Sequence, residues 1–325
     1  MRTRHAIRLP LPMGVGRGEG AWLIGAVILL ATLFAPTYAI EFQLLKRPII
    51  GRGPRDSCTT VARLDWHTDY TRAVQDAKRR QRLLVVNFVP PNDSPACAAQ
   101  CSFEKYLDTH ATLRRQLDGV VLARIPLHAK TDGAARPIID EPVFEHLGGR
   151  PGLAILDFQH SGEPYYGQVV TVLPFTPGKY YRWDNSHLAL ALDLPPGTIT
   201  QRMMVWAVRT HPEAPQSTVG EQHPALAAAA AKHSVYQARL GVQGHQNWER
   251  RFHEVRAAAD AASAREVVAE SWPDQDLVDS CIDCVESWRH SPGHWRAVRS
   301  RHRLFGYDIR RGRNGIWYGT GIFAN

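Results

Sequence analysis

A helix, a fixed turn and two strands near the C-terminal end constrain the fold of this chain more than any other feature. A helical pattern begins at Leu277, and the sequence Ser-Pro-Gly at residues 291–293 ends it. His294 follows at once, so the turn fixes the direction in which its ring points. Two strand-like runs come next, at residues 304–309 and 315–323. We expect the second strand to complete a domain built around this helix.

This order resembles the end of a CAP superfamily domain, also called an SCP-like extracellular domain. Bacterial members of that family carry a Trp-x-x-Ser-Pro-Gly-His turn, then a strand with a glycine and a final aromatic strand. The residues that match as they stand are Trp288, Ser291, Pro292, Gly293, His294, Gly306 and Phe323. The resemblance covers residues 223–325, because it also needs the helices that precede the turn, and it implies an α-β-α sandwich domain.

The same resemblance implies a functional cleft. In CAP domains, two histidines and one or two glutamates line a cleft that can bind zinc or another divalent ion. This role carries over to His245, Glu270 and His294. The family's second glutamate falls at Ser291, so the implied ligands are two histidines, one glutamate and water, the stoichiometry of an open zinc site. A hydrogen-bonded cluster that orders the cleft without metal is the alternative interpretation.

The choice of glutamate depends on the segment between the two histidines. Residues 251–270 have a helical pattern, and this predicted helix is longer than its counterpart in the family. Glu266 is therefore an alternate for Glu270. We interpret His233, on a predicted alanine-rich helix at residues 224–240, as a histidine at the edge of the core and not as a ligand.

A second sheet is predicted in the first half of the chain. Residues 83–89 form a continuous apolar run rich in β-branched side chains, which is typical of a buried central strand. A predicted helix at 69–80 precedes this strand. Further strands are predicted at 120–127 and 152–158, and residues 168–175 are the expected hairpin partner of the last one.

A cysteine pair follows the first of these strands. Ser94 is a suitable N-cap for a helix that we predict to reach about Leu117, so Cys97 falls in its first turn and Cys101 one turn later. A thiolate at a helix N-terminus is stabilised by the free amides and the helix dipole. Cys97 is therefore a candidate nucleophile and Cys101 a candidate resolving thiol, while a structural or inert pair is the alternative.

The order of these elements resembles the thioredoxin fold over about residues 61–175. Three marks carry the resemblance, namely Trp66, the cysteine pair and Pro151. In the thioredoxin family the proline before the third strand is cis and lies against the cysteines, so the resemblance implies a cis bond before Pro151 that faces Cys97. The chain departs from the family in its spacing, because three residues separate the cysteines where the redox motif has two.

The wider cysteine spacing also resembles copper-binding proteins of the Sco type, for which His146 or His160 is the candidate third ligand. A second pair, Cys281 and Cys284, lies inside the helix that starts at Leu277, away from an activating N-terminus. We interpret this second pair as buried small residues or as a local disulfide.

Residues 1–39 are predicted to be an export signal. Basic residues precede an apolar run at 21–34, and Thr-Tyr-Ala at 37–39 places small residues where a signal peptidase cleaves. An uncleaved membrane anchor is the alternative, because the uncharged segment 21–40 is just long enough to span a bilayer. The five cysteines, which include Cys58, are too few for a disulfide scaffold.

The charge of the chain argues against a nucleic-acid partner. The formal net charge is +8, of which residues 1–39 contribute +3 from four arginines and one glutamate, leaving +5 for the remainder. This positive charge is dispersed, and no aromatic platform or recognition-helix pattern accompanies it.

These observations predict an exported α/β protein of two domains. A signal peptide (1–39) and a lead-in (40–60) precede a thioredoxin-like domain (61–195), a connecting helix and linker (196–222), and a CAP-like α-β-α domain (223–325). One expected function is binding of an extracytoplasmic protein, glycan or lipid at the CAP-like cleft. The other is thiol–disulfide exchange by Cys97 and Cys101.

Overall fold

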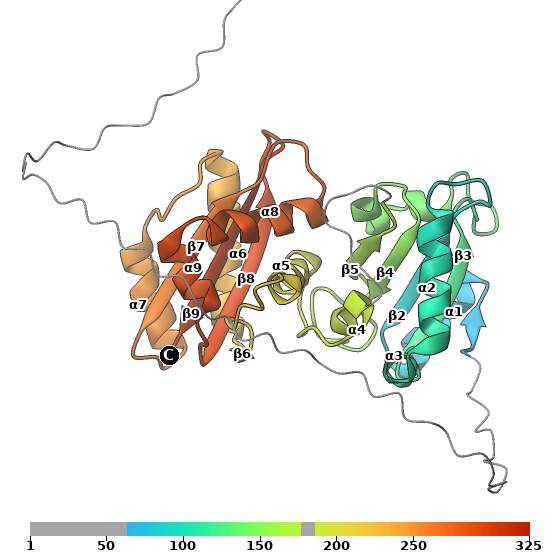
Figure 1. Ribbon diagram of the computed structural model, residues 1–325, viewed down its shortest axis with the longest axis horizontal. Helices are drawn as coiled ribbons and strands as arrows, with labels where there is room; N and C mark the ends of the chain where they lie inside the picture. Colours follow the sequence, from blue (N-terminus) through green and yellow to red (C-terminus); the bar gives the residue numbers. More distant parts are fainter. Residues whose placement is uncertain (1–63, 177–185) are drawn as a thin grey trace, which may run out of the picture. The chain divides into compact units, whose positions relative to one another are not determined.

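Two β-sheets, one of five strands and one of four, organise this mixed α/β chain (Figure 1). The computed structural model describes residues 64–176 and 186–325. The expected signal peptide, the lead-in and Cys58 lie outside the described residues, as does the segment 177–185. No helix within the described residues has both the length and the apolar character needed to cross a bilayer.

The first sheet has the strand order β1-β3-β2-β4-β5. Its strands are β1 (Trp66–His67), β2 (Leu84–Val89), β3 (Val121–Pro126), β4 (Gly152–Leu156) and β5 (Val169–Pro174). Strand β3 is parallel to both of its neighbours, β1 and β2, whereas β4 is antiparallel to both β2 and β5. Every side chain of β4 and β5 is buried, which explains why these segments are apolar on both faces.

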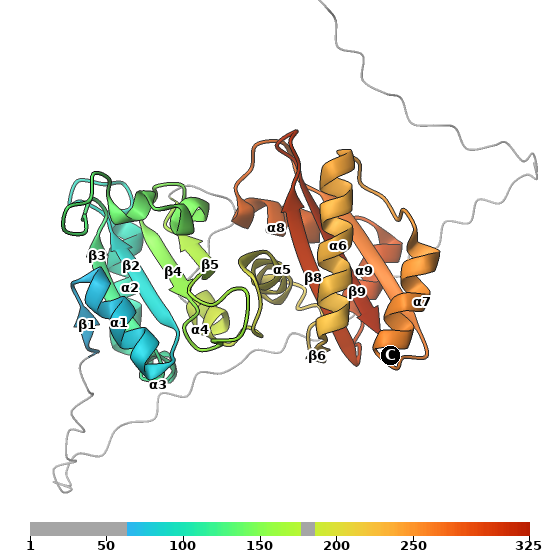
Figure 2. The same cartoon turned by 180° about the vertical axis from the view of Figure 1, so that it is seen from behind.

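Helices cover both faces of this sheet. They are α1 (Tyr70–Arg80), α2 (Cys97–Thr109), α3 (Ala111–Leu117) and α4 (Ser186–Leu192), with 3₁₀ turns η1 (Ile138–Asp140) and η2 (Pro142–Leu147). Helix α2 lies on the face seen in Figure 1, and α1 on the face seen in Figure 2. The prediction of one continuous helix to Leu117 is wrong, because His110 adopts an extended backbone (φ −108, ψ 91) and divides it.

The second sheet has the order β6-β8-β9-β7. Its strands are β6 (Glu221–Gln222), β7 (Ala264–Glu270), β8 (Leu304–Arg311) and β9 (Trp317–Ala324), and its helices are α6 (Pro224–Leu240), α7 (Trp248–Ala258), α8 (Leu277–Arg289) and α9 (Pro292–Arg299). Strands β7 and β8 both pair antiparallel with β9. Helix α6 crosses one face of the sheet, and α8 and α9 lie on the other (Figures 1 and 2).

The predicted helix at residues 251–270 is only partly present. Helix α7 ends at Ala258, and residues 264–270 form β7, which pairs along its whole length with β9. Asp260 turns the chain between the two with a positive φ of 44°. The alanine-rich sequence favours a helix locally, but pairing with a distant strand that carries the β-branched residues Val267 and Val268 into the core prevails.

The turn at residues 291–293 both ends one helix and starts another. Helix α8 stops at Arg289, as expected, but Ser291 is then the N-cap of α9 and Pro292 its first residue. Proline suits this position because its missing N–H needs no partner there and its φ is already helical. His294 therefore lies in the first turn of a short helix, and not on a loop.

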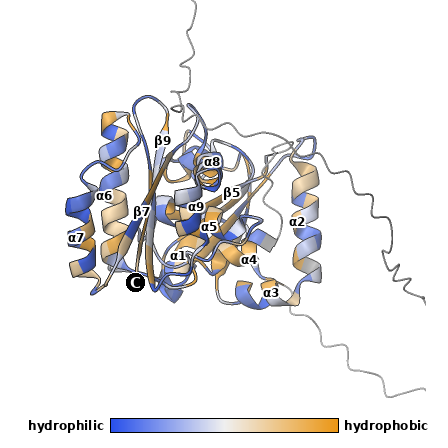
Figure 3. Ribbon diagram, turned by 60° about the vertical axis from the view of Figure 1, so that its left-hand side comes forward, coloured by the Kyte–Doolittle hydropathy of each residue, from blue (hydrophilic) through white to orange (hydrophobic). Residues whose placement is uncertain are grey.

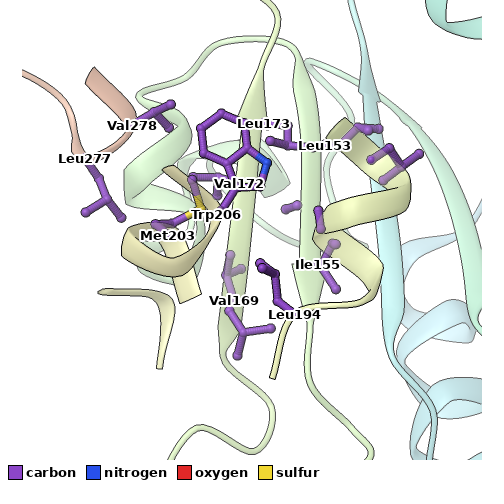
Figure 4. Close-up of a cluster of buried hydrophobic side chains, with 14 of the residues drawn as sticks. Leu153, Ile155, Val169, Val172, Leu173, Leu194, Met203, Trp206, Leu277 and Val278 are labelled. Carbon is purple, nitrogen blue, oxygen red and sulfur yellow. The ribbon is translucent and has the colours of Figure 1, made fainter. Parts of the chain in front are cut away.

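Helix α5 (Ile199–Thr210) contacts β5, β8 and α8, and so packs against elements of both sheets. A capping box between Thr198 and Gln201 starts it. Figure 3 shows that α5 is largely hydrophobic, and Figure 4 shows Met203 and Trp206 packed among side chains of β4, β5 and α8. The segment expected to be a connecting helix and linker thus contributes to the hydrophobic core.

The prediction of a cis bond before Pro151 is wrong, because every peptide bond of the described residues is trans. The trans bond lets the chain run straight into the β4–β5 pair, where the carbonyl of Pro151 accepts a hydrogen bond from the amide of Phe175 at 2.8 Å. Gly152 follows with a φ of 147°, and a Cβ there would lie 2.5 Å from the carbonyl oxygen of Leu173. The close approach of β5 explains the glycine that follows Pro151.

Candidate functional site

Two histidines from distant parts of the chain meet beside the second sheet. His245 lies in the loop between α6 and α7, and His294 is the third residue of α9. Their Nε2 atoms are 3.2 Å apart, although the residues are 49 positions apart in sequence. This confirms the expectation that the two imidazoles approach each other. Their contact is open to solvent.

Glu266 on β7 fixes the orientation of His245. Its Oε1 accepts a hydrogen bond from Nδ1 of His245 at 2.9 Å, and its own side chain is fully buried. In the neutral ring this bond places the proton on Nδ1 and leaves the lone pair of Nε2 directed at His294. Carboxylate–histidine pairs of this kind are common behind metal ligands.

Arg251 holds Glu266 from the other side. Its Nε donates to Oε2 at 2.7 Å and its Nη2 lies 2.5 Å from the same oxygen, while Nη1 donates to the carbonyl of Gln246 at 3.1 Å. Arg251 is 11% exposed, so this is a buried ion pair that lacks full water screening. The sequence carries no signal for Arg251, because its link to Glu266 depends on how α7 lies against β7.

Glu270 lies outside this cluster. It is four residues further along β7, about 13 Å away at the rise of a strand, and it is exposed. Among the described residues, no hydrogen bond or ion pair joins Glu270 to His245 or His294. The alternate, Glu266, is therefore the carboxylate of this cluster.

His233 lies beneath the cluster and is buried, as expected for a core histidine. Its Nε2 donates to the carbonyl of Gly244 at 2.8 Å and lies 3.8 Å from Oε1 of Glu266. Burial lowers the pKa of His233, and burial followed by the nearby His245 lowers that of His294. Both rings are therefore neutral at pH 7, which leaves a nitrogen lone pair on His294 available to a cation.

The donor set differs from the expected one. Nowhere in the described chain do three or more His, Cys, Asp or Glu side chains form a group that could hold a metal ion. The cluster instead offers two imidazole nitrogens, with Glu266 bonded to the far side of His245. Two imidazole nitrogens 3.2 Å apart are close enough for one zinc ion to bond to both, because Zn–N bonds measure about 2.0–2.1 Å. The residues present fit an ion held by two histidines and solvent.

Cys97 is the first residue of α2, and Cys101 is exposed one turn later. The thiol of Cys97 donates to the carbonyl oxygens of Pro91 and Asn92 at 3.1 and 3.0 Å. Ser94 is not the N-cap, because its hydroxyl accepts from the amide of Ala96 in the preceding turn. The thiol of Cys97 is therefore engaged as a donor to backbone carbonyls, and these contacts differ from the amide and cation contacts that activate a cysteine.

The remaining cysteine expectations have clear outcomes. Cys281 and Cys284 are free and fully buried on α8, and burial raises the pKa of both thiols. The local disulfide is therefore not formed, and the alternative of buried small residues holds.

His146 pairs with Glu145, and His160 with the carboxylate of Asp157 at 2.7 Å. Neither belongs to a metal-holding group within the described residues.

Comparison with known proteins gives no match: no family model fits the sequence, and no curated protein or solved structure is significantly similar to it. The geometry of the two histidines therefore carries the functional argument.

Proposed function

We propose that the chain is an exported binding protein, in which a thioredoxin-like part (61–195) accompanies a CAP-like part (223–325) that holds a divalent cation between His245 and His294. The observation that carries this proposal is the 3.2 Å approach of the two Nε2 atoms, one of which is aimed by the bond from Nδ1 to Glu266.

The strand arrangement supports both fold assignments. In the first sheet β4 alone runs opposite to the other strands. The order of helices and strands along this part of the chain is the one on which the resemblance to thioredoxin rests. The second sheet carries α6 on one face and α8 and α9 on the other, in agreement with an α-β-α sandwich. The thioredoxin-like part acts as a scaffold in this proposal.

Each residue of the cluster has a distinct task. Nε2 of His245 and Nε2 of His294 supply the two protein ligands. Glu266 fixes the tautomer and direction of His245 and makes Nε2 of His245 a stronger electron-pair donor to a metal ion. Arg251 pairs with the buried carboxylate of Glu266 and holds it in place. A bound ion would complete its coordination with water, and a protein, glycan or lipid oxygen would replace that water and so be recognised.

Zinc titration of the full chain by calorimetry tests this proposal. Replacing His245 or His294 with Ala should weaken zinc binding at least about tenfold, because each removes one of two protein ligands. His290→Ala is the matched control, since His290 is exposed and lies four residues before His294 at the end of α8, and it should bind zinc as the parent does. If zinc, nickel and copper all fail to bind the parent chain, the cluster is purely a hydrogen-bonded one.

One observation favours the second candidate, a thiol–disulfide oxidoreductase: Cys97 is the first residue of α2, where backbone amides lack helical partners. In that case Cys97→Ser should abolish reduction of a test disulfide, and Cys101→Ser should trap a mixed disulfide with the substrate. If both variants match the parent protein, this alternative fails. The trans bond before Pro151 and the carbonyl acceptors around Cys97 make it the weaker candidate.

A further inference from the structure

We propose a second binding site, on the opposite side of α9 from the histidine cluster, for a phosphate or sulfate monoester. The site is an open cavity of about 730 Å³. It is lined by Glu213, Arg289, Pro292, Trp295, Arg296 and Arg299. The proposal does not depend on cation binding by His245 and His294.

The spacing of the α9 residues separates the two sites. Residues 292, 295, 296 and 299 recur at helical intervals of three and four and therefore share one face of α9. His294 projects from a different face, toward His245. One short helix thus presents a histidine to one ligand site and an arginine-rich face to another.

Among the described residues, Glu213 is the only carboxylate that lines the cavity, and both of its oxygens already accept hydrogen bonds. Oε1 of Glu213 accepts from Nε of Arg289 at 2.7 Å, and Oε2 accepts from the indole Nε1 of Trp295 at 3.0 Å. The hydrogen bond from Arg289, and after it the one from Trp295, lowers the pKa of Glu213, so this carboxylate is ionised at neutral pH. Glu213 therefore neutralises Arg289 and positions Trp295.

Within the described residues, Arg296 and Arg299 have no carboxylate partner. Both are exposed. The described residues that line the cavity include three arginines and one glutamate, and so carry a net charge of +2. No acidic residue nearby in the sequence competes with an external anion for these arginines, because residues 287–307 contain five arginines and no aspartate or glutamate. An external anion is the simplest partner for these two guanidinium groups.

The charge and size of the cavity indicate the class of ligand. A monoester of phosphoric acid carries about −1.5 to −2 at pH 7, which matches the excess charge, and its oxygens suit the forked donors of arginine. A cavity of about 730 Å³ is far larger than one oxyanion, so the group that bears the oxyanion also enters. Trp295 is 8% exposed and offers no stacking face for a base, which disfavours nucleic acid.

Calorimetric titration of the full chain with glucose 6-phosphate and glucose 6-sulfate tests the site, with glucose as the neutral comparison. The double variant Arg296→Ala/Arg299→Ala should weaken binding of the charged sugars at least about tenfold, because it removes both unpaired forks. The control Arg239→Ala/Arg313→Ala removes the same charge from exposed positions at the end of α6 and in the β8–β9 turn, and should stay within about twofold of the parent.

A second arm distinguishes a lipid source of the same group. Vesicles of phosphatidylcholine with or without phosphatidic acid are sedimented with the parent and both double variants. A lipid headgroup is the source if the parent binds phosphatidic acid but not the charged sugars, and if Arg296→Ala/Arg299→Ala loses this binding while the control keeps it. Binding of the charged sugars supports a soluble ester. The proposal is overturned if no charged probe binds, if glucose binds equally well, or if both double variants lose affinity alike.

Discussion

The guanidinium of Arg202 on α5 donates from Nε to the hydroxyl oxygen of Thr171 on β5 at 3.0 Å, and both side chains are buried. The same group donates to the carbonyl oxygens of Ala191, Leu194 and Pro195 at 2.8, 2.9 and 3.0 Å. Burial lowers the pKa of Arg202 to about 10, so it remains charged at neutral pH. One buried arginine therefore joins α5, the last strand of the first sheet, the end of α4 and the segment that follows it.

Replacing Arg202 with Met should destabilise the protein by about 3 kcal/mol or more, because several buried acceptors lose their donor. Urea denaturation followed by circular dichroism measures the change. Arg239→Met, at an exposed position on α6, is the control and should change the unfolding free energy by less than about 0.5 kcal/mol. Equal denaturation midpoints for the two variants would show that water replaces Arg202 without loss.

Strong local periodicity made most of the fold predictable. Helix α6 has the predicted bounds, Pro224–Leu240, and β2, β8 and β9 lie where apolar runs indicated strands. Strand β7 was missed because its state depends on pairing with β9, some fifty residues later, whereas its flanking alanines favour helix. Helix α9 was missed because Ser-Pro-Gly signals the end of one helix and the start of another equally well.

The candidate site was predicted only in part, because local patterns identify some of its residues and contacts between distant segments determine the others. The turn motif identified His294, and position in the chain identified His245. The choice between Glu266 and Glu270 depends on the register of β7, which no local pattern reveals, and Arg251 depends on the packing of α7 against that strand. The arginines of the α9 cavity are dispersed in sequence and become a cluster only when α9 forms.

Stability should fall as the pH is lowered, because burial lowers the pKa values of His146, His233 and His302. Below about pH 6.5 the unfolded chain binds protons at these positions before the folded chain does, so the unfolding free energy decreases through this window until the folded groups also titrate. Urea denaturation at about pH 7.5 and about pH 5 should show the decrease.

His302 provides the residue-level test of this pH dependence. It is 3% exposed, stacks on Phe323 with ring centroids 4.6 Å apart, and donates from Nε2 to the carbonyl of Ala297 at 2.8 Å. His302→Gln should make the decrease in stability smaller, whereas His290→Gln, at an exposed position, should leave it as in the parent. A parent protein equally stable at both pH values would contradict the expectation.

The thiols should react with a maleimide in a fixed order. In a Cys58→Ser background, Cys101 should be modified first because it is exposed, and Cys97 more slowly because its sulfur is held by two carbonyls. Cys281 and Cys284 should react only after denaturation, since both are buried and burial raises the pKa of each. Mass spectrometry of peptides after timed labelling measures the order, and rapid native labelling of Cys281 would contradict the burial of α8.

Glu266 and Glu270 allow a matched test within one strand. Glu266→Gln leaves the guanidinium of Arg251, which is 11% exposed, without its counterion, so it should cost about 3–5 kcal/mol of stability. Because Glu266 also directs His245, the variant should weaken zinc binding by about tenfold to a hundredfold. Glu270→Gln makes the same chemical change at an exposed position on β7, and should alter stability by less than about 0.5 kcal/mol and leave zinc affinity unchanged. Calorimetric zinc titration and urea denaturation of both variants measure the two effects, and loss of zinc affinity in Glu270→Gln alone would transfer the role of the carboxylate from Glu266 to Glu270.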